Sequence, residues 1–232
     1  MDYGKAFTFM FADPDWLRKV GIGTLIALAG IVLSPILIGI VGFIILQGYG
    51  LEVTRNVINR KELPLPEWDD IGKNLVDGLK VAGAILIWSL PLIVAGIPLV
   101  TGTLMLDNSW GGDLEGIGFV LVCCATCLAA LWGILVAVIT PSIHVRIATT
   151  DRFSSAFELE KIWSFTRDNI GPIVIVVILT VLAGLIASLI GAAGFLICIG
   201  AIVTVPFASL WQYLVNGHLY GQVGANSVAR ID

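Results

Sequence analysis

The stretch from Val20 to Leu51 holds thirty-two residues without one charged side chain. Further charge-free runs cover 81–106, 116–145 and 169–229. A soluble domain usually carries roughly a quarter charged residues, whereas this chain carries 13% and is 57% hydrophobic. Because a helix needs ~20 apolar residues to cross a hydrocarbon core of ~30 Å, we predict an all-α protein that forms a single integral membrane domain over residues 1–232.

The length of the first run leaves two arrangements open. As one straight helix it would be about 48 Å long at ~1.5 Å per residue, which exceeds the thickness of the core. Either a single tilted span or a two-leg hairpin bent at Ser34-Pro35 fits this length, because proline disrupts a helix interior. The last run has sixty-one residues and has to cross twice.

The distribution of basic residues favours the hairpin. Lysine and arginine in short loops stay on the cytoplasmic side of a membrane. If the two middle runs cross once each and 171–218 is a second hairpin around Gly191–Gly194, the termini share one side with connections 52–80 and 146–168. All thirteen basic residues then lie on that side, whereas five passes divide them three against ten. We therefore expect six transmembrane or re-entrant helices as three hairpins in the cell (cytoplasmic) membrane, with both termini cytoplasmic.

This layout also predicts an internal repeat with units of about 1–60, 61–150 and 151–232. Each unit would begin with a cytoplasmic amphipathic helix and continue into an outward and a returning leg. The amphipathic helices are expected at Tyr3–Phe11, Pro66–Lys80 and Ser154–Asn169.

The second of these segments shows the clearest two-sided pattern. Its apolar face consists of Trp68, Ile71, Leu75 and Leu79. Its polar face consists of Asp70, Lys73, Asn74 and Asp77. This pattern predicts a helix that lies flat on the membrane with its polar face in water. Asp13-Pro14 is typical of a helix start, and Trp16, Trp68 and Trp163 lie where interfacial aromatic anchors are expected.

Several short motifs occur in a characteristic order. They are Asp13-Pro-Asp-Trp16, Gly48-Tyr49, Arg55-Asn-Val-Ile58, Leu63-Pro-Leu-Pro-Glu-Trp-Asp69 and His218-Leu-Tyr-Gly-Gln222. With these motifs the chain resembles, over nearly its whole length, the prokaryotic membrane proteins of domain-of-unknown-function family 4013. The Leu-Pro-x-Pro-x-Trp stretch is the most specific part. The resemblance implies a bacterial or archaeal membrane protein and supplies no activity and no catalytic residues.

Polar residues near the inner ends of the returning legs are the candidate site. They are Gln47, Tyr49, His144, Asn216, His218, Tyr220 and Gln222. We consider a polar vestibule around the bundle axis, with ordinary helix-end polarity at the headgroup level as the alternative. Two histidines without a carboxylate or cysteine partner are a weak metal signal, so we expect no metal and no cofactor.

The cysteines and the longest outer loop suggest no chemistry. Cys123 and Cys127 share a helix face, with Cys198 at similar depth, but thiolates in lipid without a nearby cation are costly. We interpret these cysteines as small buried core residues. The loop Asp107–Glu115 carries three carboxylates without the EF-hand spacing, and we interpret it as a solvated loop.

The class of function follows mainly from what the chain lacks. Its apolar legs contain no Asp, Glu, Lys or Arg, the residues that usually mark proton relays and ion-coupled carriers. There is no nucleophile–base or phosphate-loop motif, so we expect no enzyme, although a lipid-directed activity would have to depend on His144 or His218. A net charge of −4 leaves no basic surface for nucleic acid.

We therefore expect a non-catalytic multi-pass membrane protein that acts by contact, as a scaffold, an accessory subunit or an organiser of lipids. Its partners would be membrane lipids, other membrane-protein subunits or further copies of the chain. The alternative is a channel or facilitator for small solutes, with a pore between the returning legs.

Overall fold

The computed structural model describes residues 1–107, 114–196 and 200–228, and every regular element in these ranges is a helix. The long helices are α2 (Trp16–Leu33), α3 (Gly39–Ile58), α4 (Ile71–Leu106), α5 (Glu115–Thr150), α7 (Ile170–Phe195) and α8 (Ala201–Val228). The shorter elements are α1 (Lys5–Thr8), α6 (Leu159–Asp168) and the 3₁₀ helices η1 (Phe9–Ala12), η2 (Ser34–Ile36) and η3 (Phe153–Phe157). The prediction of an all-α protein is confirmed.

Four segments of the described chain are long and apolar enough to cross a membrane. They are Trp16–Ile36, which joins α2 to η2, and the helices α4, α5 and α7. The long helices follow one another as neighbouring pairs, α2 with α3, α4 with α5 and α7 with α8. The chain reverses between α2 and α3 at Ser34–Ile36, where Leu37 adopts a left-handed backbone (φ 62°).

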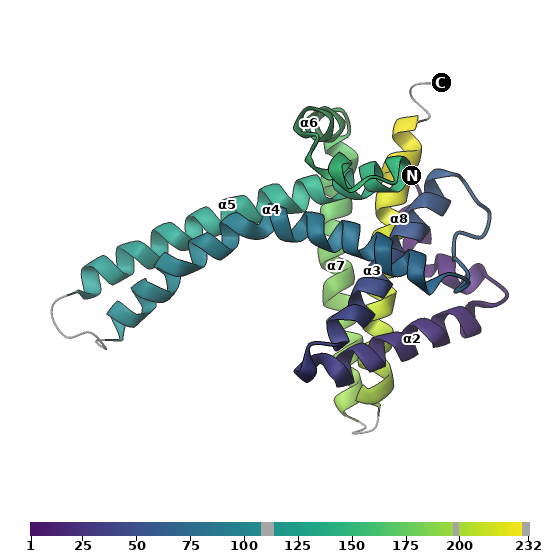
Figure 1. Ribbon diagram of the computed structural model, residues 1–232, viewed down its shortest axis with the longest axis horizontal. Coiled ribbons are helices and arrows are strands. Elements are labelled where there is room, and N and C mark those ends of the chain that lie inside the picture. The colour runs from purple at the N-terminus through teal and green to yellow at the C-terminus, as the bar shows by residue number, and fades with distance from the viewer. Residues whose placement is uncertain (108–113, 197–199, 229–232) are drawn as a thin grey trace.

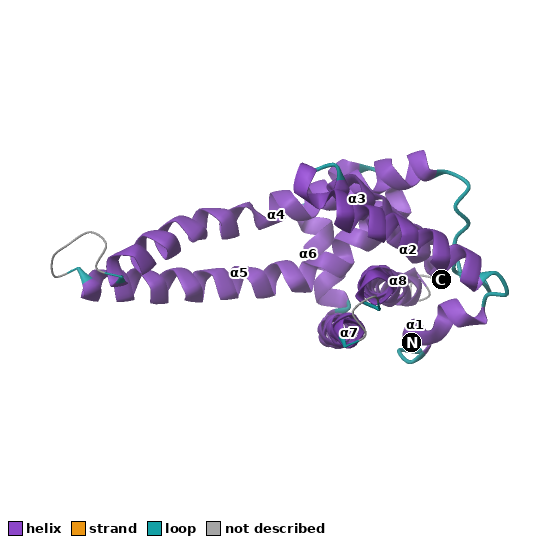
Figure 2. Cartoon of the chain, turned by 90° about the horizontal axis from the view of Figure 1, so that it is seen from below, coloured by secondary structure: helices purple, strands orange, loops and turns teal. Residues whose placement is uncertain are grey.

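The pair α4–α5 runs crosswise to the pair α7–α8. Figure 2 shows α7 and α8 end-on, while α4 and α5 extend across the view. The outer half of α4–α5 projects beyond all other described elements (Figure 1). Each of these helices has 36 residues and is about 54 Å long at ~1.5 Å per residue, longer than a hydrocarbon core. The three pairs therefore do not form one parallel bundle.

Helix α3 lies at the centre of the packing and contacts α2, α4, α5 and α8. It approaches α4 at backbone distance, because a Cβ atom at Gly48 would overlap the Asn74 carbonyl and one at Gly78 would overlap the Ile44 carbonyl. It approaches α8 in the same way, since a Cβ atom at Gly217 would overlap the Gly50 carbonyl. Glycine at these positions sets the distance between the three helices.

The prediction of a separate surface helix at Pro66–Lys80 is wrong in two respects, the extent of the helix and the direction of its faces. Helix α4 begins at Ile71 and continues without a break into the apolar leg. Its polar residues Asn74 and Asp77 are only 5% and 2% exposed, whereas Ile71 and Leu79 are about half exposed. Asp77 turns inward because Arg55 of α3 and Lys80 neutralise it there, whereas Asp70 and Lys73 of the same face remain exposed.

The other two expected surface segments consist of more than one element. Tyr3–Phe11 contains α1 and most of η1, and Ser154–Asn169 contains most of η3 followed by α6. Helix α2 begins at Trp16 rather than directly after Asp13. Instead of capping a helix there, the Asp13 carboxylate accepts a hydrogen bond from the Asp15 amide (2.8 Å) and pairs with Lys19.

The last reversal of the chain lies beyond the position expected from the glycines. Helix α7 continues through Gly191 and Gly194 to Phe195, so the turn does not lie around Gly191–Gly194. These glycines serve packing, because a Cβ atom at Gly194 would overlap Thr204 and Ala201 of α8.

The cysteines are not buried core residues as we expected. Cys123, Cys124 and Cys127 are free and exposed on α5, because α4 is the only described helix beside the outer half of α5. Cys198 lies outside the described residues, as do residues 108–113 of the outer loop.

We expect Gly78→Ala to lower the stability of the folded protein, because the added methyl group overlaps the backbone of α3. Overpacking of this kind costs about 1–3 kcal/mol. Gly96→Ala on the same helix is the control, since nothing lies within 4 Å of its Cβ position. Thermal unfolding in uncharged detergent measures both. Equal midpoints for the two variants would show that the α3–α4 contact does not determine stability.

Candidate functional site

The connection from α3 to α4 is held by side chains that donate to its carbonyl groups. The Pro64 carbonyl accepts from Asn56 Nδ2 (2.9 Å), that of Leu65 from Lys19 Nζ (3.3 Å) and that of Pro66 from the Tyr49 hydroxyl (2.7 Å). Prolines lack a backbone donor and favour extended chain, so these carbonyls need side-chain partners when the segment is buried. The Leu-Pro-x-Pro-x-Trp stretch thus acts as a strap across α2 and α3.

Trp68 completes this strap. Its ring stacks on Tyr49 with 3.9 Å between centroids, and its Nε1 donates to the Lys19 carbonyl (2.8 Å). Lys19 is only 6% exposed, and its ammonium group pairs with Asp13 (2.7 Å) and Glu67 (2.8 Å). These contacts hold Trp68 against Tyr49 of α3 and against the first turn of α2.

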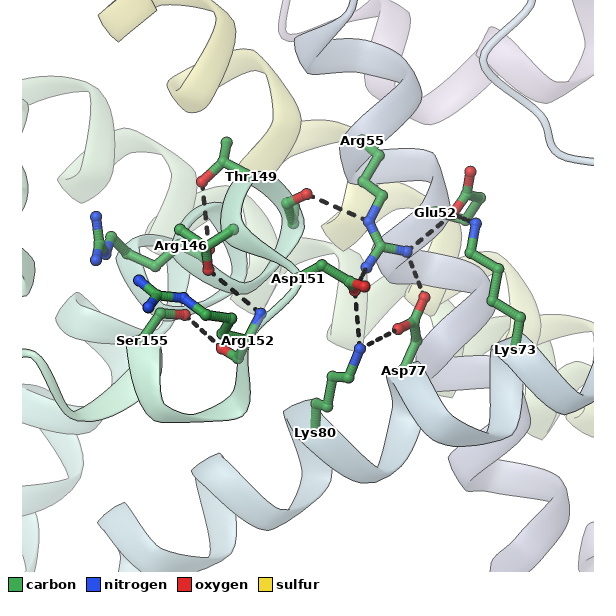
Figure 3. A network of polar contacts seen from close by, with 12 residues as sticks. Glu52, Arg55, Lys73, Asp77, Lys80, Arg146, Thr149, Asp151, Arg152 and Ser155 are labelled. Carbon is green, nitrogen blue, oxygen red and sulfur yellow. Dashed lines mark hydrogen bonds and ion pairs between the residues drawn. The ribbon is translucent and has the colours of Figure 1, made fainter.

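A second polar cluster joins α3, α4 and the end of α5 (Figure 3). We call it the ionic junction; it consists of Glu52, Arg55, Lys73, Asp77, Lys80 and Asp151. The Arg55 guanidinium donates to Asp77, to Asp151 (2.8 Å) and to the Ala148 carbonyl (3.2 Å). Lys80 pairs with Asp77 (3.1 Å) and Asp151 (2.8 Å). The base of the α4–α5 hairpin is therefore tied to α3 by charge.

A third cluster surrounds Glu158, between η3 and α6. Its carboxylate pairs with Arg146, with Lys161 (2.9 Å) and with Arg152 (3.4 Å). The hydrogen bond from Lys161, together with the charges of Arg146 and Arg152, lowers the pKa of Glu158 below its ordinary value. Its stabilising contribution is therefore present above the ordinary carboxyl pKa and is lost as the pH falls through the lowered value.

Four of the seven residues in the predicted vestibule meet in one cavity. Gln47 of α3, His144 of α5, and Asn216 and Tyr220 of α8 line a space of about 120 Å³ between these three helices. Thr140 and Tyr213 add hydroxyl groups, and no charged side chain is among the residues that line it.

The polar groups of this cavity have defined roles. His144 Nδ1 lies 3.0 Å from the Thr140 carbonyl. Because a carbonyl only accepts, Nδ1 carries the proton and Nε2 of the neutral ring is an acceptor. Asn216 Oδ1 is buried without a hydrogen-bond partner among the described residues. The cavity therefore offers acceptors to a water molecule or to a small uncharged donor.

The other three candidate residues lie elsewhere. Tyr49 is buried beneath Trp68. His218 and Gln222 line a different cavity of about 400 Å³ near the N-terminus of the chain. Gln222 Nε2 donates to the Asp2 carbonyl (2.6 Å), and the His218 ring packs on Phe9 at 4.5 Å between centroids. The seven residues therefore do not share one vestibule.

The remaining candidate anchors differ in exposure. Trp16 is half-buried beside Phe11, with 5.0 Å between ring centroids. Trp163 on α6 is 62% exposed. A position at the membrane interface stays a prediction for both.

A polar track along α8 did not emerge from the sequence. Three neighbouring cavities follow one face of this helix, and adjacent cavities share Ser209 with Gln212 and then Tyr213 with Asn216. Their volumes are about 380, 200 and 120 Å³. The spacing of three and four residues from Ser209 to Tyr220 is the signal that would have indicated a shared face.

The described residues contain no group of three or more His, Cys, Asp or Glu placed to hold a metal ion. The ionic junction and the strap were also not expected, because charged residues outside the apolar runs were assumed to face water. Reciprocal charges spaced three or four apart, such as Glu52 with Arg55 and Asp77 with Lys80, were the available signal.

The fold and its polar clusters define a multi-helical protein of the membrane type. A family model described as "Protein of unknown function (DUF4013)" matches residues 31–197, and the chain belongs to this family. The match is narrower than the resemblance suggested, since it leaves out Asp13–Trp16 and His218–Gln222. No match was found among curated proteins, and none among solved structures.

We expect Asp77→Asn to destabilise the protein by about 2–4 kcal/mol, because it leaves Arg55 and Lys80 with an unbalanced buried charge. Arg18→Gln is the control, since Arg18 is 60% exposed and its pair with Glu67 contributes no more than about 1 kcal/mol. Denaturant unfolding followed by tryptophan fluorescence compares the two. A smaller loss for Asp77→Asn than for Arg18→Gln would contradict a structural role for the ionic junction.

Proposed function

We propose that this protein is a non-catalytic multi-pass protein of the cytoplasmic membrane that acts by contact, binding lipids and another membrane protein through its α4–α5 hairpin. One observation carries the proposal: the outer half of this hairpin projects away from the rest of the molecule and exposes aliphatic and aromatic side chains around its circumference. The most exposed are Ile93, Val94, Ile97, Val100, Phe119, Val120, Leu128, Leu131 and Ile134.

Three polar side chains of the hairpin form hydrogen bonds within it. The hydroxyls of Thr101 and Thr103 donate to the carbonyls of Ile97 (2.9 Å) and Val100 (2.8 Å). Trp132 Nε1 donates to the Trp88 carbonyl (2.8 Å). The surface therefore suits acyl chains and apolar helices, which pack by dispersion and shape, and has little to offer a polar solute.

The base of the hairpin is suited to hold such a surface in a fixed direction. Arg55 and Lys80 of the ionic junction bridge α3 and α4 to Asp151, directly after α5. The six-leg topology with cytoplasmic termini belongs to the same proposal. It is supported by the position of the N-terminus and α6 near the C-terminal end of α8, away from the end of α7 and the start of α8 (Figure 1).

A second candidate is a facilitator for small uncharged polar solutes. The polar track along α8 favours it, because Gln212 and Asn216 place amide groups along one cavity-lined face of this helix. The backbone contacts of α3 with α4 and α8 speak against an open pore, since they leave a cavity of about 120 Å³ between the returning helices. We therefore rank contact above facilitation.

We expect a photocrosslinking residue at Ile97, on the outer half of α4, to form adducts with another membrane protein in native membranes. The same residue at Ile178 on α7, which is 61% exposed compared with 67% for Ile97, is the matched control and should react with lipid only. Mass spectrometry of the adducts reads out both positions. Lipid adducts alone at Ile97 would contradict a protein partner on the hairpin.

The facilitator makes a different prediction, which is tested in proteoliposomes. With the native cysteines replaced by alanine, single cysteines at Ser209, Gln212 and Asn216 report access from water along the track. For a contact protein we expect less than about a tenth of the labelling of an exposed control at Lys161, because lipid and protein exclude the aqueous reagent. Full labelling at all three positions together with solute flux would establish the facilitator instead.

A further inference from the structure

A cavity of about 400 Å³ lies at the polar ends of α1, α3 and α8 and is separate from the α4–α5 hairpin. Its volume lies within the range of ~300–1,000 Å³ that is typical of small-molecule sites. The charged residues that line it are Asp2, Lys5, Arg60, Lys61 and Glu62, and its more buried residues include Pro64, His218 and Gln222.

The cations of this cavity differ from most others in the protein. Of the twelve basic residues that the structure describes, eight take part in ion pairs. Within the same described residues, Lys5, Arg60, Lys61 and Arg167 take part in none. Three of these four line one cavity. A chain that neutralises most of its cations in ion pairs elsewhere thus leaves three unpaired cations here, in a lining that also holds the carboxylates of Asp2 and Glu62.

The main chain of two of these residues, Arg60 and Lys61, has a defined conformation. Helix α3 ends at Ile58, and the Lys61 amide donates back to the Asn56 carbonyl (3.0 Å). Between them Arg60 adopts a left-handed backbone (φ 54°). The Asp2 carboxylate accepts the Lys5 backbone amide (3.1 Å) and so is partly occupied. The backbone that carries Arg60 and Lys61 is therefore formed before any ligand arrives, which reduces part of the ordering cost of binding.

Gln222, one of the more buried residues that line the cavity, carries an unused acceptor. Gln222 is 9% exposed; its Nε2 donates to the Asp2 carbonyl, and its Oε1 is buried without a partner among the described residues. A lone amide acceptor requires a donor, and a hydroxyl group supplies one. The cations and this acceptor together match a group that combines negative charge with a hydroxyl.

We propose that this cavity binds the phosphate of a hydroxyl-bearing phosphate ester, with Lys5, Arg60 and Lys61 on the phosphate and Gln222 accepting from the hydroxyl. The ester is either the headgroup of an anionic phospholipid or a phosphate ester free in the aqueous phase. This site goes beyond the contact function, which depends on the α4–α5 hairpin. A negative result for the phosphate-ester site therefore does not contradict the contact function, and the reverse also holds.

Calorimetric titration of the full chain in uncharged detergent tests the site. The probes are short-chain phosphatidylglycerol, glycerol phosphate and inorganic phosphate, with short-chain phosphatidylcholine as the zwitterionic comparison. We expect phosphatidylglycerol or glycerol phosphate to bind more tightly than inorganic phosphate. The triple variant Lys5→Gln, Arg60→Gln, Lys61→Gln should lose affinity on the order of a hundredfold, at roughly fivefold per cation.

A triple variant on another face controls for charge. Arg152→Gln, Lys161→Gln and Arg167→Gln remove the same positive charge without touching the cavity and should keep the affinity within about twofold. Gln222→Met should weaken the hydroxyl-bearing ligands selectively and leave inorganic phosphate unchanged. Unfolding midpoints confirm that each variant is folded.

Comparing phosphatidylglycerol with glycerol phosphate distinguishes a lipid headgroup from a free phosphate ester. Tight binding of phosphatidylglycerol with weak binding of glycerol phosphate identifies a lipid headgroup, and equal binding of both identifies a free ester. Absence of binding by the folded wild-type chain, or an equal loss in the two triple variants, overturns the proposal.

Discussion

Helix α3 approaches α4 and α8 at backbone distance, and the rest of the structure depends on this contact. Gly48 and Gly78 bring α3 against α4, and Gly50 and Gly217 bring it against α8. Lipid offers little hydrophobic drive for helix association, so close packing of small residues carries much of the binding. The same contact aligns the polar ends of these helices and closes most of the space between the returning legs.

The charges at these ends are organised by that packing. Asp77 lies almost fully buried because α4 brings it to Arg55, and Lys19 is buried because the strap brings Glu67 to it. A buried ion pair costs desolvation that good geometry and extra hydrogen bonds offset. The Arg55–Asp77 pair joins α3 to α4, and the Lys19–Glu67 pair joins α2 to the strap. These charges fix the base of the α4–α5 hairpin, while its outer half projects beyond the other described elements.

Sequence patterns located the apolar helices and the reversal at Ser34–Ile36, since length, charge and proline act locally. They correctly grouped Gln47, His144, Asn216 and Tyr220. They did not predict that Tyr49, His218 and Gln222 lie apart from this group. The polar face of Asn74 and Asp77 was assigned to water because periodicity shows which residues share a face and not what covers it. The threefold internal repeat stays a prediction.

The sequence by itself determined which medium, lipid or water, surrounds the apolar helices. Runs without charge have to lie in lipid, because their backbone is satisfied as helix and their side chains gain by leaving water. Only the tertiary structure decided which polar residues meet, since that depends on contacts between residues far apart in the chain. The crosswise path of α4–α5, the inward Asp77 and the unpaired cations that line one cavity with Gln222 are all arrangements of this kind.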